Sequence, residues 1–291
     1  MNDDINPSSD KSQNDCVIEN ADKLVERISK FNSVIVAYSG GVDSCVVAQA
    51  AFKALGAEKA IAVIAISPSL ARRELKIAEK GAAKIGMELR CVHTNEIENP
   101  EYVANDGRRC FHCKTELYRN LRVFAETSDF ETILNGTNLD DFSDYRPGLE
   151  AAEQFTVRSP LADCKFTKSD VRDIARHWEL PVWNKPASPC LASRIAYNES
   201  VEPAKLQMIE AAEDWLLEKG FIEMRVRYHA GDLAKVELPE HDLRKMLDGE
   251  LRKELTSTLK KIGFRHVTLD LEGFRSGSMN VGLPLVQIDA T

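Results

Sequence analysis

Long apolar segments and an export signal are both missing from this 291-residue sequence. No apolar run approaches the ~18 residues that a membrane-spanning helix needs. Residues 1–20 are polar and lack the apolar core that secretory signals carry. We therefore expect a cytoplasmic protein that is not associated with a membrane.

An excess of basic residues is also missing. Lys and Arg together number 38, against 46 Asp and Glu, so the formal net charge is -8. This balance argues against a broad surface for nucleic acid, because the overall field repels phosphates. The seven cysteines are an odd number in a chain without an export signal, which indicates reduced thiols and no disulfide framework.

Near-continuous apolar runs alternate with helical patterns in the first part of the chain. Such runs are typical of strands that are buried on both faces of a parallel sheet. We expect strands at residues 33–38, 60–66, 88–93 and 132–134, with helices after the loop at 39–44 and at residues 70–85 and 114–126. Because strands alternate with helices, the sequence predicts a doubly wound α/β domain with a parallel sheet.

The pattern changes near residue 185. A connector is followed by a helix at 203–219, alternating strands at 223–228 and 234–238, a helical stretch at 241–262 and a last strand at 266–271. This order predicts a smaller α+β domain. The expected organisation is an α/β domain at 20–185, then a connector with the α+β domain at 186–291. Residues 1–19 are too polar to bury a core and are expected to form a disordered tail.

The segment SGGVDS at residues 39–44 lies between a predicted strand and a predicted helix. Adjacent glycines let the backbone approach a ligand closely, and the free N–H groups of a helix start attract an anion. The expected phosphate-binding residues are Ser39, Gly40, Gly41, Asp43 and Ser44. Asp43 is also a candidate ligand for a metal ion that carries the phosphates. A glycine turn capped by Ser44 is the simpler alternative.

This loop is not a Walker loop, because it lacks the lysine of that motif. SGGVDS instead resembles the fingerprint of the PP-loop ATP pyrophosphatases. The resemblance covers about residues 20–180. It implies cleavage of ATP between the α and β phosphates and transfer of AMP to the substrate.

A second segment, GTNLDD at residues 136–141, follows the fourth predicted strand. Ligands of open α/β sheets collect at the carboxyl edge where this segment lies. Gly136 and Thr137 are expected to contact the nucleotide. Asp140, Asp141 and Asp144 are close enough in sequence for one or two of them to hold Mg²⁺. A polar turn whose side chains cap its own backbone is the alternative.

Cys190 is the most informative cysteine, because it lies in SPCLASR on the connector between the predicted domains. A thiolate there could attack an adenylated carboxylate, and Arg194 could stabilise that thiolate or bind a phosphate. A small buried hydrophobe is the alternative for Cys190. Cys45 and Cys91 follow apolar patterns and are expected in the core.

Cys110 and Cys113 form a C-x-x-C within RCFHCK. No second C-x-x-C completes a four-cysteine zinc site, so a metal site, a redox pair and a coincidence at a helix start all stay open. With Cys190, these cysteines could offer three thiolates to an iron–sulfur cluster, such as [4Fe–4S], with one open iron.

Six segments resemble, in order, those of the LarE-type sulfur transferases: SGGVDS, RCFHCK, NGTNLDDFSDYRPG, SPCLASRI, RVRYHAGDLAKVEL and TLDLEGFRSGSMN. The similarity spans almost the whole chain after the tail. It implies that ATP, with Mg²⁺, adenylates a pyridinium dicarboxylate mononucleotide during biosynthesis of the nickel-pincer nucleotide of lactate racemase. It also implies that Cys190 attacks the adenylate and gives up its sulfur. Dehydroalanine then remains in the protein, and each chain acts once.

The same resemblance implies roles in the second domain. Arg225 and Arg227 alternate onto one strand face, from which both could reach the substrate phosphate with Arg194. Glu213 and Glu237 are candidates for an acidic, metal-binding patch. Related proteins form closed homo-oligomers, so a hexamer is expected. Some relatives are thought to use a cluster with an extra sulfide. The retained PCLASR favours the sacrificed cysteine here, and Cys110 and Cys113 leave the question open.

Two other functions stay open. A tRNA thiolase of the same superfamily would need a basic RNA surface, and its affinity would fall with salt. A non-catalytic ATP sensor would have no use for intact Ser39, Asp43, Ser44 and Cys190. An amide-forming enzyme related to NAD synthetase would use ammonia, so replacing Cys190 with Ala would leave its activity intact.

Overall fold

The computed structural model describes residues 7–143 and 147–275. The chain divides into two compact units, each of which is described by itself. Unit 1 comprises Met1–Ile66, Arg72–Thr94 and Lys114–Ala187. Unit 2 comprises Ser67–Ala71, Asn95–Cys113 and Ser188–Thr291. Two short segments from the first half of the chain, Ser67–Ala71 and Asn95–Cys113, therefore belong to unit 2. The sequence pattern did not indicate this assignment.

Unit 1 is built on a four-stranded parallel sheet. Its strands are β1 (Val34–Ala37), β2 (Ala60–Ile66), β3 (Leu89–His93) and β4 (Thr132–Leu134). Their order is β3-β2-β1-β4, and Val36 pairs with both Ala62 and Leu134. The central position of β1 explains its apolar run, since a strand with neighbours on both sides and helices above and below meets no water. The predicted doubly wound α/β fold is confirmed.

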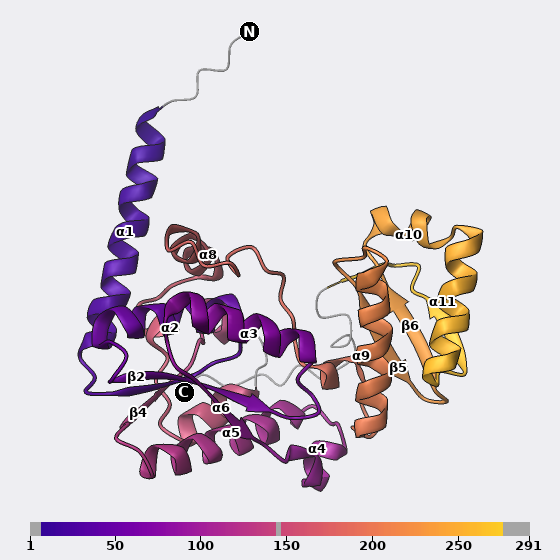
Figure 1. Ribbon diagram of the computed structural model, residues 1–291, viewed down its shortest axis with the longest axis horizontal. Helices are drawn as coiled ribbons and strands as arrows, with labels where there is room; N and C mark the ends of the chain where they lie inside the picture. Colours follow the sequence, from indigo (N-terminus) through magenta and orange to yellow (C-terminus); the bar gives the residue numbers. More distant parts are fainter. Residues whose placement is uncertain (1–6, 144–146, 276–291) are drawn as a thin grey trace. The chain divides into compact units, whose positions relative to one another are not determined.

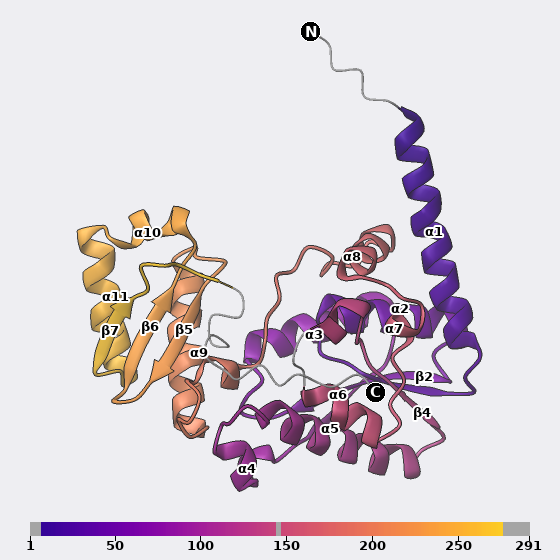
Figure 2. The ribbon, with the colours of Figure 1, turned by 180° about the vertical axis from the view of Figure 1, so that it is seen from behind.

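Helices cover both faces of this sheet, as Figure 1 and Figure 2 show. One layer contains α2 (Val42–Leu55) and α3 (Arg72–Ile85), and α1 (Pro7–Ser29) and α8 (Lys168–His177) both pack against α2. The opposite layer contains α5 (Arg109–Glu126) and α6 (Pro147–Gln154). Between β4 and α8 the chain also forms η2 (Leu139–Ser143) and α7 (Pro160–Asp163).

Two expectations about unit 1 were wrong. The tail expected at residues 1–19 is helical from Pro7, because α1 continues outward from the apolar stripe that buries Leu24 and Ile28. Residues 1–6 lie outside the described part. Cys91 is exposed, because β3 is the edge strand of the sheet and turns several side chains to solvent.

Unit 2 contains a three-stranded sheet in the order β5-β6-β7. Strands β5 (Arg225–His229) and β6 (Leu233–Glu237) are antiparallel, and β7 (His266–Leu269) is parallel to β6. The unit also contains η1 (Glu96–Glu98), α4 (Pro100–Val103), η3 (Leu191–Arg194), α9 (Pro203–Glu218), α10 (Glu240–Met246) and α11 (Gly249–Ile262). The single helix expected at 241–262 is therefore two helices. Asp248 separates them by capping the first N–H groups of α11.

An apolar core joins these pieces of unit 2. Leu191 and Ala192 of η3, Tyr102 of α4 and Phe221 after α9 are all buried in it. The core therefore draws the segment after Cys190 onto the same scaffold as the residues that precede α5. Among the described residues, no helix is both long and apolar enough to cross a bilayer.

Candidate functional site

The predicted phosphate loop lies between β1 and α2 in unit 1. Ser39 and Ser44 close it, since the Ser44 hydroxyl accepts from the Ser39 N–H, contacts the Ser39 hydroxyl and donates to the Gly41 carbonyl, each at 3.1 Å. Among the described contacts, no side chain caps α2 at Gly41. The first N–H groups of α2 are thus oriented for an anion, and Asp43 in the first turn can hold a cation that accompanies it.

Two glycines in this region are required by close contacts. Gly40 has φ +68°, and a Cβ there would lie 2.7 Å from the Ala78 Cβ on α3. A Cβ on Gly136 would lie 2.8 Å from the Ser44 nitrogen. The Gly136–Thr137 segment therefore rests directly against the start of α2, as the shared sheet edge predicts.

The aspartates of unit 1 meet in one hydrogen-bonded network. Asn138 donates from Nδ2 to Asp43 Oδ1 at 3.1 Å, and its own N–H donates to Asp141 Oδ2 at 3.0 Å. Asp140 Oδ2 accepts from the Lys168 N–H at 2.9 Å. Three of the proposed metal ligands are thus linked through Asn138 and Lys168. Asp144, the fourth aspartate of this region, lies outside the described residues.

Two lysines at the loop were not anticipated from the sequence. Lys168 forms an ion pair with Asp43, and a capping box of Thr167 and Asp170 fixes the start of α8 beside it. Lys185 Nζ lies 2.5 Å from Glu74 Oε2 and 3.4 Å from the Gly40 carbonyl oxygen. Each lysine gives the loop a positive charge suited to phosphates.

Cys45 lies behind the loop and is buried, as expected. Its thiol contacts the Tyr38 hydroxyl at 3.0 Å. Burial, partly offset by that hydrogen bond, raises the pKa of the Cys45 thiol to about 11. Cys45 is therefore unsuited to act as a nucleophile near neutral pH.

Cys190 belongs to unit 2, is exposed and precedes η3. Its carbonyl oxygen accepts three hydrogen bonds: from the Ser193 N–H at 3.0 Å, the Ser193 hydroxyl at 2.7 Å and Arg194 at 3.0 Å. Arg194 also binds the Pro189 carbonyl. The backbone around Cys190 is thus held in place while its thiol faces solvent.

Arg194 has a different position from the one expected. Its guanidinium is only 1% exposed and pairs with Glu213, which is fully buried, at 3.0 Å. With its remaining N–H groups on backbone carbonyls, Arg194 supports the Cys190 loop from inside and does not present itself to a substrate phosphate. Glu213 in turn also accepts from the Val226 N–H, so α9, η3 and β5 are joined at this carboxylate.

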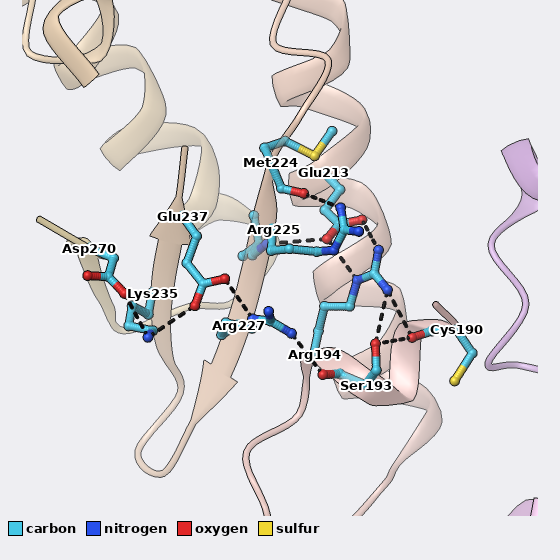
Figure 3. A network of polar contacts seen from close by, with 11 residues as sticks. Cys190, Ser193, Arg194, Glu213, Met224, Arg225, Arg227, Lys235, Glu237 and Asp270 are labelled. Carbon is cyan, nitrogen blue, oxygen red and sulfur yellow. Dashed lines mark hydrogen bonds and ion pairs between the residues drawn. The ribbon is translucent and has the colours of Figure 1, made fainter. Parts of the chain in front are cut away.

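Arg225 and Arg227 do share one face of β5, opposite Glu237 and Lys235 of β6. Arg227 donates to Glu237 at 2.9 Å and to the Ser193 carbonyl at 3.0 Å. Figure 3 shows these residues converging with Arg194 and Glu213. Glu237 also pairs with Lys235 at 3.1 Å. The carboxylates proposed as metal ligands in unit 2 are therefore bonded to cations.

Cations and carboxylates alternate in this cluster. Among the residues that Figure 3 labels, Arg194, Arg225, Arg227 and Lys235 lie with the carboxylates of Glu213, Glu237 and Asp270. Burial, and next the charge of Arg194, lower the pKa of Arg225 to about 10. A guanidinium whose cationic form is disfavoured in this way gains from an incoming anion. Arg225 is therefore the residue of the cluster best suited to a phosphate.

A second set of contacts fixes the Cys190 segment from the other side. Asn105 donates to the Ala196 and Glu199 carbonyls at 2.8 and 2.9 Å. Arg109, which is buried, donates to Asn105 Oδ1 at 2.5 Å and to the Ala192 carbonyl at 2.9 Å. The start of α5 is thereby tied to the segment that follows Cys190.

The three candidate cluster ligands share this neighbourhood. Cys190 and Cys110 both act on the Arg109 guanidinium, whose pKa they raise against the opposite effect of burial. Burial, Cys190 and Cys113 together hold the pKa of Tyr102 well above its usual range. Nevertheless, within residues 7–143 and 147–275 no three His, Cys, Asp or Glu side chains are arranged to hold a metal ion. Thiolates are the donors that an iron–sulfur cluster takes.

Comparison with known proteins gives a consistent result. The family model for NAD synthase matches residues 17–109, which include the loop and β1 to β3. The chain is 41% identical over 259 residues to an uncharacterised protein of Synechocystis, covering 89% of this chain and 96% of that protein. It is 30% identical over 247 residues to an uncharacterised protein of Methanocaldococcus jannaschii, covering 85% and 92%.

A further relative, which matches over most of its length, is named for an activity. The chain is 34% identical over 265 residues to the pyridinium-3,5-bisthiocarboxylic acid mononucleotide synthase of Lactiplantibacillus plantarum. The match covers 91% of this chain and 95% of that enzyme, so it includes both units.

Proposed function

We propose, from the premise that the chain belongs to the LarE-type family of PP-loop, ATP-dependent sulfur transferases, that it converts a pyridinium dicarboxylate mononucleotide to a thiocarboxylate with sulfur from Cys190. The observation that carries this proposal is the Cys190 loop. The Cys190 thiol is exposed, and the buried side chains of Arg194 and Arg109 hold the backbone around it by hydrogen bonds to the Cys190 and Ala192 carbonyls. Beside it lies the cationic cluster of Figure 3.

The first step is adenylation of a substrate carboxylate. The loop at Ser39–Ser44 and the start of α2 bind the phosphates of ATP, and Lys168 and Lys185 add positive charge as pyrophosphate leaves. One or two of Asp43, Asp140 and Asp141 would hold Mg²⁺ against the phosphates, whose charge the ion neutralises in such reactions. Gly136 and Thr137 lie against the loop and would contact the nucleotide.

The second step is attack by Cys190. Its sulfur adds to the activated carbonyl and AMP leaves, which gives a thioester between protein and substrate. The Cβ–S bond of Cys190 then breaks, so that sulfur remains on the substrate as a thiocarboxylate and dehydroalanine remains in the chain. Arg225, with Arg227 beside it, would hold the substrate phosphate during both steps.

A cluster-borne sulfide is the competing source of sulfur. It is supported by the shared neighbourhood of Cys110, Cys113 and Cys190, whose charges act on Arg109 and Tyr102. We also propose a homo-oligomer, with a hexamer as the form to be checked by light scattering.

The test is intact-protein mass spectrometry with peptide mapping after turnover with ATP, Mg²⁺ and the dicarboxylate mononucleotide. We expect loss of the mass of H₂S from the peptide that contains Cys190, with at most one thiocarboxylate per chain. Cys190→Ala should release pyrophosphate but form no thiocarboxylate. Cys91→Ser, which changes an exposed cysteine of unit 1, should behave as the unaltered chain.

Three other outcomes would redirect the proposal. Thiolated product with an unchanged protein mass would assign the sulfur to a cluster or an external donor, and iron and sulfide analysis would separate these. Activity that survives Cys190→Ala with ammonia would indicate amide formation. Failure to use the mononucleotide at all would reopen the question of substrate.

A further inference from the structure

Two cations lie directly opposite each other in the sheet of unit 2. Arg227 of β5 pairs in register with Lys235 of β6. Like charges in such cross-strand positions repel each other and destabilise a sheet. Water screens this pair only in part, since the two side chains are 7% and 29% exposed. The arrangement therefore needs a compensating anion.

Glu237 compensates for this repulsion, because it binds both cations at once. Its Oε2 accepts from Arg227 Nε at 2.9 Å, and its Oε1 lies 3.1 Å from Lys235 Nζ. The Glu237 side chain is fully buried. A buried carboxylate with one cation becomes an unpaired charge when that cation leaves. With two cations, Glu237 can release one and stay paired.

Lys235 is held from its other side by Asp270, as Figure 3 shows. Its Nζ lies 2.9 Å from Asp270 Oδ2. The Asp270 N–H donates to the Val236 carbonyl, and Asp270 Oδ1 accepts from the Glu272 N–H, each at 2.9 Å. Burial disfavours the charge of Lys235, but the hydrogen bonds to Asp270 and Glu237 outweigh it and raise the pKa of the ammonium group. Lys235 is thus a fixed and charged partner for Glu237.

In the part of the chain that the structure describes, the other basic side chains near Glu237 are less suited to this role. Arg194 pairs with Glu213, and its other contacts are backbone carbonyls of its own loop. His229 shares this face of β5, but burial lowers its pKa, so the ring is uncharged near neutral pH. Arg225 lies opposite Glu237 and is the residue to which the proposed function assigns the substrate phosphate.

We propose that Lys235 is a positioning residue for substrate binding, because it keeps Glu237 paired while Arg227 exchanges that carboxylate for the phosphate of the mononucleotide. The inference rests on the proposed function, which assigns the phosphate to Arg225 and Arg227. A phosphate carries more charge than a carboxylate and offers a guanidinium two oxygens at once. Glu237 is therefore an internal stand-in for the phosphate.

Arg227 also relates the phosphate to Cys190. Its Nη1 donates to the Ser193 carbonyl at 3.0 Å, and the Ser193 N–H and hydroxyl both donate to the Cys190 carbonyl. Arg227 keeps this contact with η3 when its Nε passes from Glu237 to a phosphate oxygen. The exchange thus places the substrate phosphate in a fixed relation to the backbone of Cys190.

The test is calorimetric binding to the full-length protein. An α,β-methylene analogue of ATP, which cannot be cleaved to AMP, occupies the phosphate loop. The ligands are the dicarboxylate mononucleotide and the matching nucleoside, which lacks the phosphate. Lys235→Met should bind the mononucleotide about 10-fold more weakly and the nucleoside unchanged, and Lys235→Arg should restore most of the affinity. Lys253→Met, which changes an exposed lysine of α11, should bind both ligands as the unaltered chain does.

A double-mutant cycle separates pairing with Glu237 from direct attraction of the phosphate. Glu237→Gln removes the carboxylate that Arg227 and Lys235 share. In that background Lys235→Met should weaken mononucleotide binding by less than about twofold. Circular dichroism checks the fold of each variant, and the comparison of Lys235→Met with Lys235→Arg does not depend on the Glu237 variants.

Two results would overturn the proposal. Equal losses of affinity for the mononucleotide and the nucleoside in Lys235→Met would make Lys235 a structural residue. A 10-fold loss that persists in the Glu237→Gln background would make Lys235 a direct contact of the phosphate. If the unaltered chain bound the mononucleotide no more tightly than the nucleoside, the phosphate assignment of the proposed function would fail instead, and that result is visible before any variant is made.

Discussion

Both units place ion pairs beside a candidate site, but they place them at different depths. In unit 1, Asp43 and Lys168 keep 23% and 36% of their side chains exposed. In unit 2, Arg194 and Glu213 keep 1% and 0%. The shallow pair can exchange partners for a ligand, because water replaces what is lost. The deep pair cannot, since either partner alone would be a buried charge.

This difference in depth suggests different roles for the two sets of charges: contact with a ligand in unit 1 and structural support in unit 2. The charges of unit 1 surround a loop at the start of α2, and their partial exposure suits transient contacts with phosphates. Those of unit 2 hold η3, α9 and β5 together, and so fix the position of Cys190. The comparison predicts that substitutions in unit 2 mainly change stability, and that those in unit 1 mainly change activity.

The largest effect is expected at Glu213. Glu213→Ala leaves the buried Arg194 guanidinium without its carboxylate, which should lower the free energy of unfolding by about 3–5 kcal/mol. Urea denaturation would measure the change. Glu218→Ala, at an exposed position of the same helix, should change stability by less than about 0.5 kcal/mol.

A double replacement sharpens this result. Arg194→Met with Glu213→Leu removes both charges, so most of the lost stability should return. The Pro189 carbonyl would still lack its Arg194 donor and the Cys190 carbonyl would lose one of its three, so sulfur transfer should stay impaired. A double variant as unstable as Glu213→Ala would contradict the view that the unpaired charge causes the loss.

The next effect is expected at Asp43, and on activity. Asp43→Asn removes the charge that pairs with Lys168 and that we propose holds Mg²⁺, so pyrophosphate release should fall about 100-fold, with a higher Mg²⁺ requirement. The unfolding free energy should change by about 1 kcal/mol or less. Asp163→Asn breaks another half-exposed pair of unit 1, with Arg27, and should leave pyrophosphate release unchanged. Equal losses of pyrophosphate release in Asp43→Asn and Asp163→Asn would contradict a specific role for the charge of Asp43.

The site residues of the two units could not be predicted equally well from the sequence. The loop was predictable because Ser39 to Ser44 are contiguous and lie between a strand and a helix. Lys168 and Lys185 were not, because they meet Asp43 and Glu74 across 125 and 111 positions of the chain. In unit 2 the alternation of Arg225 and Arg227 predicted their shared face correctly.

Alternation does not identify a side chain's partner or depth, however. Arg194 was therefore expected to bind a phosphate, and Glu213 and Glu237 to bind a metal ion. In the structure, Arg194 forms an ion pair with Glu213, and Arg227 forms one with Glu237. Cys91 was misplaced for a similar reason, since the sequence does not reveal which strand lies at the edge of the sheet.

A smaller effect is expected at Gly40, where backbone and packing can be separated. Gly40 and Gly56 both have positive φ, +68° and +75°, but a Cβ on Gly56 would meet nothing within 4 Å. Gly56→Ala should therefore lose only backbone strain, about 1–3 kcal/mol, because φ +75° with ψ 177° is a conformation essentially confined to glycine. Gly40→Ala also displaces α3 at Ala78, so it should lose about 1–3 kcal/mol more and weaken ATP binding, measured by calorimetry. Equal losses would show that φ alone matters.

The smallest effect is expected at the buried contact between the Tyr38 hydroxyl and the Cys45 thiol in unit 1, both of which are uncharged near neutral pH. Burial raises the pKa of the Cys45 thiol to about 11, so at pH 7 roughly one thiol in ten thousand is ionised. Maleimide labelling, followed by peptide mapping, should leave Cys45 unmodified while exposed Cys91 reacts.

The same shift fixes the sign of a pH effect. The unfolded thiol ionises near its reference pKa of 9.0, and the folded one only near 11. Because burial makes ionisation of Cys45 costly in the folded state, that state binds more protons between these values. The free energy of unfolding is therefore unaffected by this thiol below about pH 8 and declines as the pH rises towards 11. Cys45→Ala should flatten that decline in urea denaturation curves from pH 8 to 10. An identical slope in both proteins, or labelling of Cys45 as fast as Cys91, would mean that the contact beneath the loop opens to solvent.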